Sequence, residues 1–81
     1  VMNVASLLAH ATQLLVQHGV ETAALDARIL LQHTLQVSAE WLVANHVSPL
    51  DANTALAFDG VIARRCAHEP VAYITGRQAF W

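Results

Sequence analysis

The sequence predicts an all-α protein, a compact bundle of four helices plus a short fifth helix. Apolar residues recur at three- and four-residue spacing along most of the chain, the period that gives a helix one buried face. Capping residues, Gly and Pro divide this pattern into five segments, and only the last residues look extended. Connections of about two to four residues make successive helices antiparallel or steeply angled neighbours.

The first helix is expected over about residues 4–18. Asn3 is a suitable N-cap, and Gly19 lies where a left-handed residue ends a helix. The second helix is capped by Thr22 and closes near Leu35.

Apolar residues on the second helix form a broad surface. Leu25 and the run 29–31 are expected to be buried, so this helix is expected to be central. Asp26 lies in its first turns, where a carboxylate favours the helix dipole, and it has no cation at helical spacing on the same helix.

The third and fourth helices follow two serines. Ser38 caps a short helix over about 39–45, which Trp41 anchors in the core together with Leu42. Ser48 followed by Pro49 predicts the N-cap and first residue of a longer helix, which runs to about Ala67.

The predicted fourth helix has one apolar face with a glycine in its middle. Asp51 is expected to complete a capping box with Ser48. Gly60 costs about 1 kcal/mol relative to Ala, and a close helix crossing would explain it. The expected buried residues of this face are Ala55, Phe58, Ile62 and Cys66, flanked by Ala52, Leu56 and Val61.

The last helical segment begins at Pro70, expected at the first helical position, and ends at Gly76. Tyr73 is expected to pack in the core with Val71 and Ile74. Residues 77–81 look extended. We therefore expect a helical domain over residues 1–76, followed by the start of a linker at 77–81 that leads to an absent domain.

Composition excludes several classes of protein. The chain has 81 residues, enough for one domain, and 56% hydrophobic with 12% charged residues excludes intrinsic disorder. No apolar run approaches the roughly 20 residues that span a bilayer, so we expect no membrane association. The net charge of −2 and the lack of lysine argue against a helix-turn-helix or other nucleic-acid binder. A lone cysteine, Cys66, indicates a reduced cytoplasmic setting.

The sequence contains no recognisable metal-binding, nucleophile or phosphate-binding motif. The five histidines are 8 to 22 residues apart, so no two share one helix face as metal ligands. Cys66 is expected to be a buried hydrophobe rather than a nucleophile. Three glycines leave no room for a phosphate-binding or nucleophile-elbow motif. We therefore expect no catalytic, cofactor-binding or metal-binding residue in the chain.

Candidate binding residues lie near the C-terminus. Arg64, Arg65 and Arg77 form a cationic cluster that either binds a partner or only complements the helix end and pairs with Glu69. Because adjacent helical residues point about 100° apart, Arg64 and Arg65 are not expected to serve one contact. Phe80 and Trp81 are expected to pack at the linker against a neighbouring domain.

Two stretches carry a resemblance to a known family. The run Arg64–Arg65, Glu69–Gly76 (EPVAYITG) and Phe80–Trp81 resembles the region that joins the two domains of release factor glutamine methyltransferases, the HemK/PrmC family. The run LDARILLQH, residues 25–33, is similar to that family's second helix, and the Ser48–Pro49 start also fits. The family usually has Gly where His68 stands, and it often has a charged residue near Gln78.

The resemblance covers about residues 4–81 and implies a two-domain enzyme. A C-terminal catalytic domain would use S-adenosylmethionine to methylate, at N5, the glutamine of the Gly-Gly-Gln loop of class I peptide chain release factors. The family's catalytic and cofactor residues map onto none of residues 1–81. The helical domain would then dock the release factor and contact its own catalytic domain. A stand-alone helical interaction module without enzymatic activity is the alternative.

Overall fold

A computed structural model describes residues 2–76, which form five helices and no strand. The helices are α1 (Val4–Gln17), α2 (Ala23–Leu35), α3 (Ala39–Ala44), α4 (Ala52–Cys66) and α5 (Val71–Thr75). The predicted all-α class and the number of helices are therefore confirmed. The extended tail predicted for residues 77–81 lies outside the described residues.

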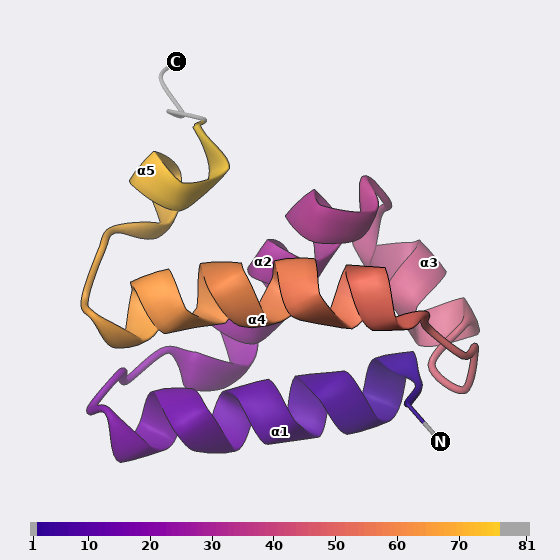
Figure 1. The fold of residues 1–81 in the computed structure, drawn as a ribbon, viewed down its shortest axis with the longest axis horizontal. Helices are drawn as coiled ribbons and strands as arrows, with labels where there is room; N and C mark the ends of the chain where they lie inside the picture. The colour runs from indigo at the N-terminus through magenta and orange to yellow at the C-terminus, as the bar shows by residue number, and fades with distance from the viewer. Residues whose placement is uncertain (1, 77–81) are drawn as a thin grey trace.

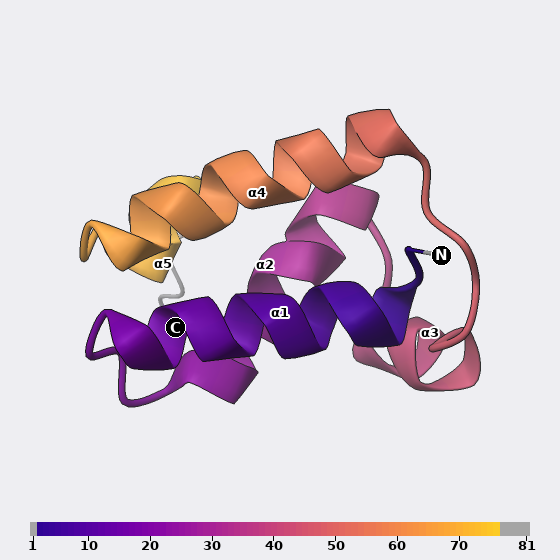
Figure 2. The same cartoon turned by 60° about the horizontal axis from the view of Figure 1, so that its bottom comes forward.

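The second helix is central, as its broad apolar surface predicts. It packs against all four other helices. α1 and α4 lie side by side and run in the same direction, while α2 returns between them on one side (Figures 1 and 2). α3 lies at the end of the bundle where α1 and α4 begin, and α5 lies at the end where α4 finishes (Figure 1).

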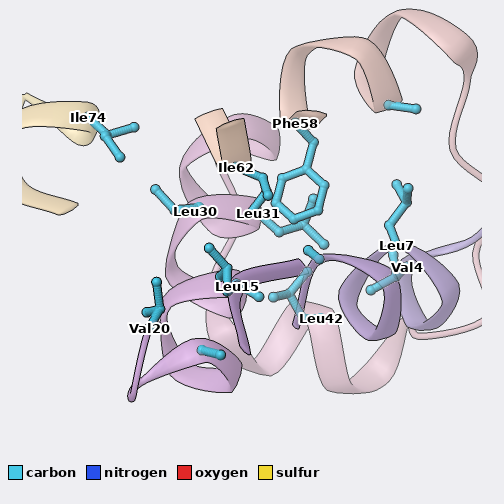
Figure 3. Close-up of a cluster of buried hydrophobic side chains, with 14 residues drawn as sticks. Val4, Leu7, Leu15, Val20, Leu30, Leu31, Leu42, Phe58, Ile62 and Ile74 are labelled. Atoms are coloured by element: carbon cyan, nitrogen blue, oxygen red, sulfur yellow. The ribbon is translucent and has the colours of Figure 1, made fainter. Parts of the chain in front are cut away.

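The core forms where α1, α2 and α4 meet. Phe58 of α4 is 1% exposed and lies beside Leu31 of α2, and Leu15 of α1 is fully buried (Figure 3). Ile74 extends from α5 toward Leu30, so the short fifth helix also contributes to this core (Figure 3). Burying a large aliphatic or aromatic side chain stabilises the fold by about 1.5–3 kcal/mol, so these positions contribute strongly to stability.

The start of α1 is closed by two sets of hydrogen bonds. The Asn3 side chain accepts from the Ser6 amide at 2.8 Å, and the Ser6 hydroxyl accepts from the Asn3 amide at 3.0 Å. The amides of Val4 and Ala5 donate to carbonyls of the α3–α4 loop, at 3.3 and 2.8 Å. Asn3 is therefore the N-cap, as predicted, and the free amides of the first turn have partners.

The predicted start of α4 is wrong by three residues. Asp51, not Ser48, is the N-cap, and its carboxylate accepts from the Thr54 amide at 2.7 Å. Pro49 instead pairs with Asn3 in an isolated antiparallel bridge. Ser48 uses its carbonyl for the Val4 amide, so tertiary contact with α1 competes with an earlier helix start. Ser38 caps α3 as predicted, accepting from the Trp41 amide at 3.1 Å.

Two apolar residues that were expected inside lie outside. Leu25 and Tyr73 are 52% and 68% exposed. The buried face of α2 contains Ala23, Ala27, Leu30 and Leu31. Leu25 does not lie on this face and is exposed to solvent. Gly60 is exposed, and a Cβ added there would meet nothing within 4 Å, so the expected close crossing is wrong.

Two long helices end in the same hydrogen-bonded turn. At the end of α1, the amides of Gly19 and Val20 donate to the carbonyls of Val16 and Leu15, at 3.0 and 2.9 Å. At the end of α4, the amides of His68 and Glu69 donate in the same pattern to Arg65 and Arg64, at 2.8 and 3.2 Å.

This pattern is a Schellman motif, which needs a left-handed residue after the helix. Gly19 has φ +80° and His68 has φ +67°. A left-handed turn is therefore present at His68, with a histidine where glycine is favoured.

Candidate functional site

The two adjacent arginines of α4 point to different partners, as their helical positions predict. The Arg65 side chain turns inward and is 20% exposed, and its Nε donates to Asp26 Oδ2 at 2.8 Å. The Arg64 side chain stays outside, at 48% exposure, and pairs with the Glu69 carboxylate. Arg64 therefore remains the more accessible of the two for a partner.

Asp26 is a buried carboxylate in the first turn of α2. Its side chain is 7% exposed, and it follows Ala23 and precedes Ala27 on the buried side of α2. Oδ2 accepts a second hydrogen bond from the Thr22 hydroxyl at 2.9 Å. Thr22 thus stands at the N-cap of α2 as predicted, but its side chain binds Asp26 rather than capping a helix amide.

The Asp26–Arg65 pair was not predicted from the sequence, because the two residues are 39 positions apart. A signal was nevertheless present. Asp26 shares a helix face with Ala23, Ala27 and Leu30, so a buried α2 face carries it inside. A buried carboxylate needs a cation or several hydrogen-bond donors, and the chain has only four arginines to supply one.

The same arginine also fixes the connection to α5. Arg65 Nη1 donates to the Glu69 backbone carbonyl at 3.2 Å, and the Glu69 side chain binds Arg64. We call Asp26, Arg64, Arg65, His68 and Glu69 the exit junction. It joins the start of α2 to the end of α4 and sets the turn from which α5 departs. Pro70 precedes α5 as its N-cap rather than as its first residue.

Charge pairing at the exit junction changes two pKa values. The hydrogen bond from Arg64 lowers the pKa of Glu69 below its ordinary value of 4.5. The same contact raises the pKa of Arg64 above its already high usual value. Since the folded pKa of Glu69 is depressed, its contribution to stability is present above pH 4.5 and is lost as the pH falls through the folded value.

Two hollows of the described residues lie between helices, one between α1 and α4 and one at the ends of α2 and α5. A groove of about 500 Å³ runs between the second halves of α1 and α4, with a mainly apolar lining. Its lining residues are His10, Leu14, His18, Asp59, Ile62, Ala63, Cys66 and Ala67. The second hollow, the α2–α5 cavity, has about 420 Å³ and lies between the end of α2 and the end of α5. Its lining is more polar, and His33 and Thr75 form part of it.

Side chains that could hold a metal ion are not assembled in residues 2–76. No three His, Cys, Asp or Glu side chains of this part of the chain are close enough to hold a metal ion. Cys66 packs against the core, and burial raises the pKa of its thiol, which keeps it protonated near neutral pH. None of the five described helices has the length and apolar character that a membrane span requires.

The remaining candidate residues, Arg77, Phe80 and Trp81, lie outside the described residues. The predicted cationic cluster of Arg64, Arg65 and Arg77 is therefore placed only in part. Within that part, Arg65 pairs with the buried Asp26, and Arg64 is exposed and pairs with Glu69.

A family model described as the PrmC N-terminal domain matches residues 6–76. Among curated proteins, the chain is 38% identical over 79 residues to a bifunctional methyltransferase of Rickettsia conorii, covering 98% of the chain and 15% of that protein. It is 36% identical over 80 residues to the release factor glutamine methyltransferase of Vibrio cholerae, covering 99% of the chain and 28% of that protein. No solved structure matches the chain.

These findings define the chain as a helical domain of the kind found in methyltransferases. It belongs to the PrmC N-terminal domain family. The resemblance to the HemK/PrmC family is thereby confirmed. The chain spans only 15% to 29% of the length of the three relatives from Rickettsia conorii, Vibrio cholerae and Cereibacter sphaeroides.

Proposed function

We propose that this chain is the substrate-docking domain of an S-adenosylmethionine-dependent methyltransferase that methylates N5 of the Gly-Gly-Gln glutamine of class I release factors. The observation that carries the proposal is the family match over residues 6–76, together with relatives named as release factor glutamine methyltransferases. In this proposal the methyl donor binds a C-terminal catalytic domain of the parent enzyme in the cytoplasm. The residues of the helical domain take no part in methyl transfer.

A docking role has a physical reason. The reacting amide of a protein substrate must be held in near-attack geometry, and a large substrate offers contacts far from that amide. Binding energy from such remote contacts can be used to orient the reacting group. A rigid helical unit joined to the catalytic domain through the exit junction supplies a surface for this purpose.

The surface offers several apolar side chains for docking. Val43 and Val47, on α3 and in the turn after it, are 74% and 68% exposed. Leu56 on α4 and Tyr73 on α5 are each 68% exposed. Because these four side chains are mostly in solvent, charged substitutions there are expected to leave the fold intact.

The test uses the full-length parent enzyme with intact release factor and with a short Gly-Gly-Gln peptide as substrates. Val43→Asp, Val47→Asp, Leu56→Asp and Tyr73→Asp are made one at a time, and kcat/KM is measured for both substrates. Docking predicts that at least one variant loses about tenfold or more with the intact factor and nothing with the peptide.

Deletion of residues 1–76 completes the test. We expect the deletion to remove the preference for intact factor over peptide while S-adenosylmethionine binding persists. Unchanged methylation of intact factor in the deletion and in all four variants would mean that the domain does not dock the substrate.

A further inference from the structure

One guanidinium group connects three parts of the fold at the end of α4. The Arg65 Nε atom donates to Asp26 Oδ2 on α2 at 2.8 Å, and the Arg65 Nη1 atom donates to the backbone carbonyl of Glu69 at 3.2 Å. A guanidinium is planar, and its N–H groups have fixed directions. The Glu69 carbonyl is therefore held at a defined place relative to the buried start of α2.

The position of that carbonyl determines where α5 begins. The Glu69 carbonyl belongs to the peptide group that joins Glu69 to Pro70, and peptide groups are planar. The ring of Pro70 then restricts the next backbone angle, φ, which is −60° here. Val71, the first residue of α5, follows directly. Few free rotations thus separate the Arg65 guanidinium from the first turn of α5.

Other contacts of α5 give it little directional support. The helix has five residues, far fewer than the roughly 12–15 that an isolated helix needs to be stable in water. Ile74 is the one buried side chain among the five, and Val71 is partly buried. Because apolar packing has no preferred direction, the directional bonds of Arg65 define the angle at which α5 leaves the bundle. The turn before α5 does not favour this path by itself, since His68 is held at φ +67°.

We propose that Arg65 is a positioning residue of the parent methyltransferase, whose bonds to Asp26 and to the Glu69 carbonyl set the angle at which the chain leaves the helical domain toward the catalytic domain. The inference rests on the proposed docking function. A release factor bound to the helical domain is then presented to the catalytic domain in one orientation. In this role Arg65 acts through α5 and contacts neither the release factor nor the methyl donor.

Positioning and stability can be separated at the Asp26–Arg65 pair. A buried ion pair can be replaced by well-packed apolar side chains with little loss of stability. The double variant Asp26→Leu, Arg65→Met makes that replacement, and methionine has no N–H group to donate to the Glu69 carbonyl. The double variant therefore keeps the domain folded and loses the bond that directs α5. Arg65→Lys is a second variant, which keeps the charge beside Asp26 but not the planar fork that serves two acceptors.

The first measurement is amide hydrogen exchange of residues 70–76 in the full-length parent enzyme. The amides of Tyr73 and Ile74 donate to the Pro70 carbonyl, at 3.0 and 3.2 Å. We expect these amides to exchange about tenfold faster in both variants. Exchange across α1 and α4 checks that the domain stays folded. Unchanged exchange of residues 70–76 in both variants would mean that α5 keeps its place without Arg65, and it would overturn the proposal.

The second measurement is methylation kinetics of the same enzymes with intact release factor and with a short Gly-Gly-Gln peptide. We expect both variants to lower kcat for the intact factor about tenfold or more, because a misplacement of about 1 Å can cost about a hundredfold in rate. The dissociation constant for the factor and kcat/KM for the peptide should stay unchanged. A general loss of folded enzyme would instead lower the activity toward both substrates equally.

The control is Arg28→Met. Arg28 lies on α2 two positions after Asp26, is exposed, and forms no ion pair within residues 2–76. We expect this variant to leave both the exchange of residues 70–76 and kcat unchanged.

The outcomes separate this inference from the docking function on which it rests. An unchanged kcat for the intact factor in both Arg65 variants overturns the positioning role alone. A weaker dissociation constant without a change in kcat would make Arg65 part of the docking surface, and it overturns the positioning role as well. If deletion of residues 1–76 leaves methylation of the intact factor unchanged, the docking function fails and the positioning role fails with it.

Discussion

The ends of α1 and α4 form the same Schellman turn by different means. At the first end, Gly19 takes the left-handed position, and Val20 and Leu15 bury an apolar contact beneath the turn. At the second end, His68 takes that position, and the residues equivalent to Val20 and Leu15 are the ion pair Glu69 and Arg64.

The difference shows which residues determine the conformation of each turn. The α1 turn is set by local sequence, because glycine adopts positive φ without steric cost. The α4 turn carries backbone strain, and contacts from a distant helix hold it, since Arg65 binds both Asp26 on α2 and the Glu69 carbonyl. Local residues therefore determine the α1 turn, whereas the α4 turn also depends on a contact with α2.

The largest expected effect comes from breaking the support of the α4 turn. Asp26→Ala removes the carboxylate that binds Arg65, and the Arg65 side chain is only 20% exposed. Removing one member of a buried pair destabilises by about 3 kcal/mol. Urea unfolding at neutral pH measures this loss. The double variant Asp26→Leu, Arg65→Met should recover most of the lost free energy of unfolding. A loss below about 1 kcal/mol for Asp26→Ala would contradict the dependence of the α4 turn on the Asp26–Arg65 pair.

Gly19→Ala tests the turn at the end of α1, which local residues determine. A Cβ at this position meets nothing within 4 Å, so only the backbone strain at φ +80° opposes it. We expect a loss of about 1–2 kcal/mol in the free energy of unfolding. The matched control is Gly60→Ala, which also meets nothing within 4 Å but lies in a helix interior. It should gain about 1 kcal/mol, and the same sign for both variants would refute the assignment of strain.

His68→Gly tests the strain at the α4 turn from the opposite direction. Glycine removes the Cβ penalty at φ +67°, so we expect a gain of about 1 kcal/mol. Thermal and urea unfolding of the variant give the value. A neutral or destabilising result would mean that His68 has a compensating contact and that the turn is not strained.

The smallest expected effect is the pH dependence of the α4 turn. The Glu69 pKa is depressed in the folded chain, so its contribution fades as the pH falls below 4.5. Unfolding curves for Glu69→Gln should depend less on pH in that range than those for the parent. Asp51→Asn is the comparison variant, because the pKa of Asp51 is also lowered, by its hydrogen bond with Thr54 at the start of α4. Identical acid sensitivity in Glu69→Gln and the parent would count against the pairing.

Local signals predicted the parts of the fold that local physics controls. Asn3, Ser38, Gly19 and Gly76 mark helix ends in the sequence and in the structure alike. Spacing alone also places Leu30, Leu31, Phe58 and Ile62 in the core. Each of these predictions needs only one helix period or one backbone preference.

Predictions failed where a distant segment decides the outcome. Ser48 and Pro49 carry a good helix-start signal, but the chain uses them to pair with the start of α1. Arg65 looked like a helix-end cation, and its partner Asp26 is on another helix. The candidate site is therefore less predictable than the fold, because it is built from contacts between segments far apart in the sequence.

The hydrogen bonds between Met2, Val4 and Ala5 and the α3–α4 loop have a practical consequence for protein engineering. Trimming residues 1–5 would leave the carbonyls of His46 and Ser48 without their amide donors, some forty positions further along the chain. A shortened version would therefore lose order around Pro49 before it lost helix α1 itself. Purification tags and fusions are best joined ahead of Met2, with the segment after it kept intact.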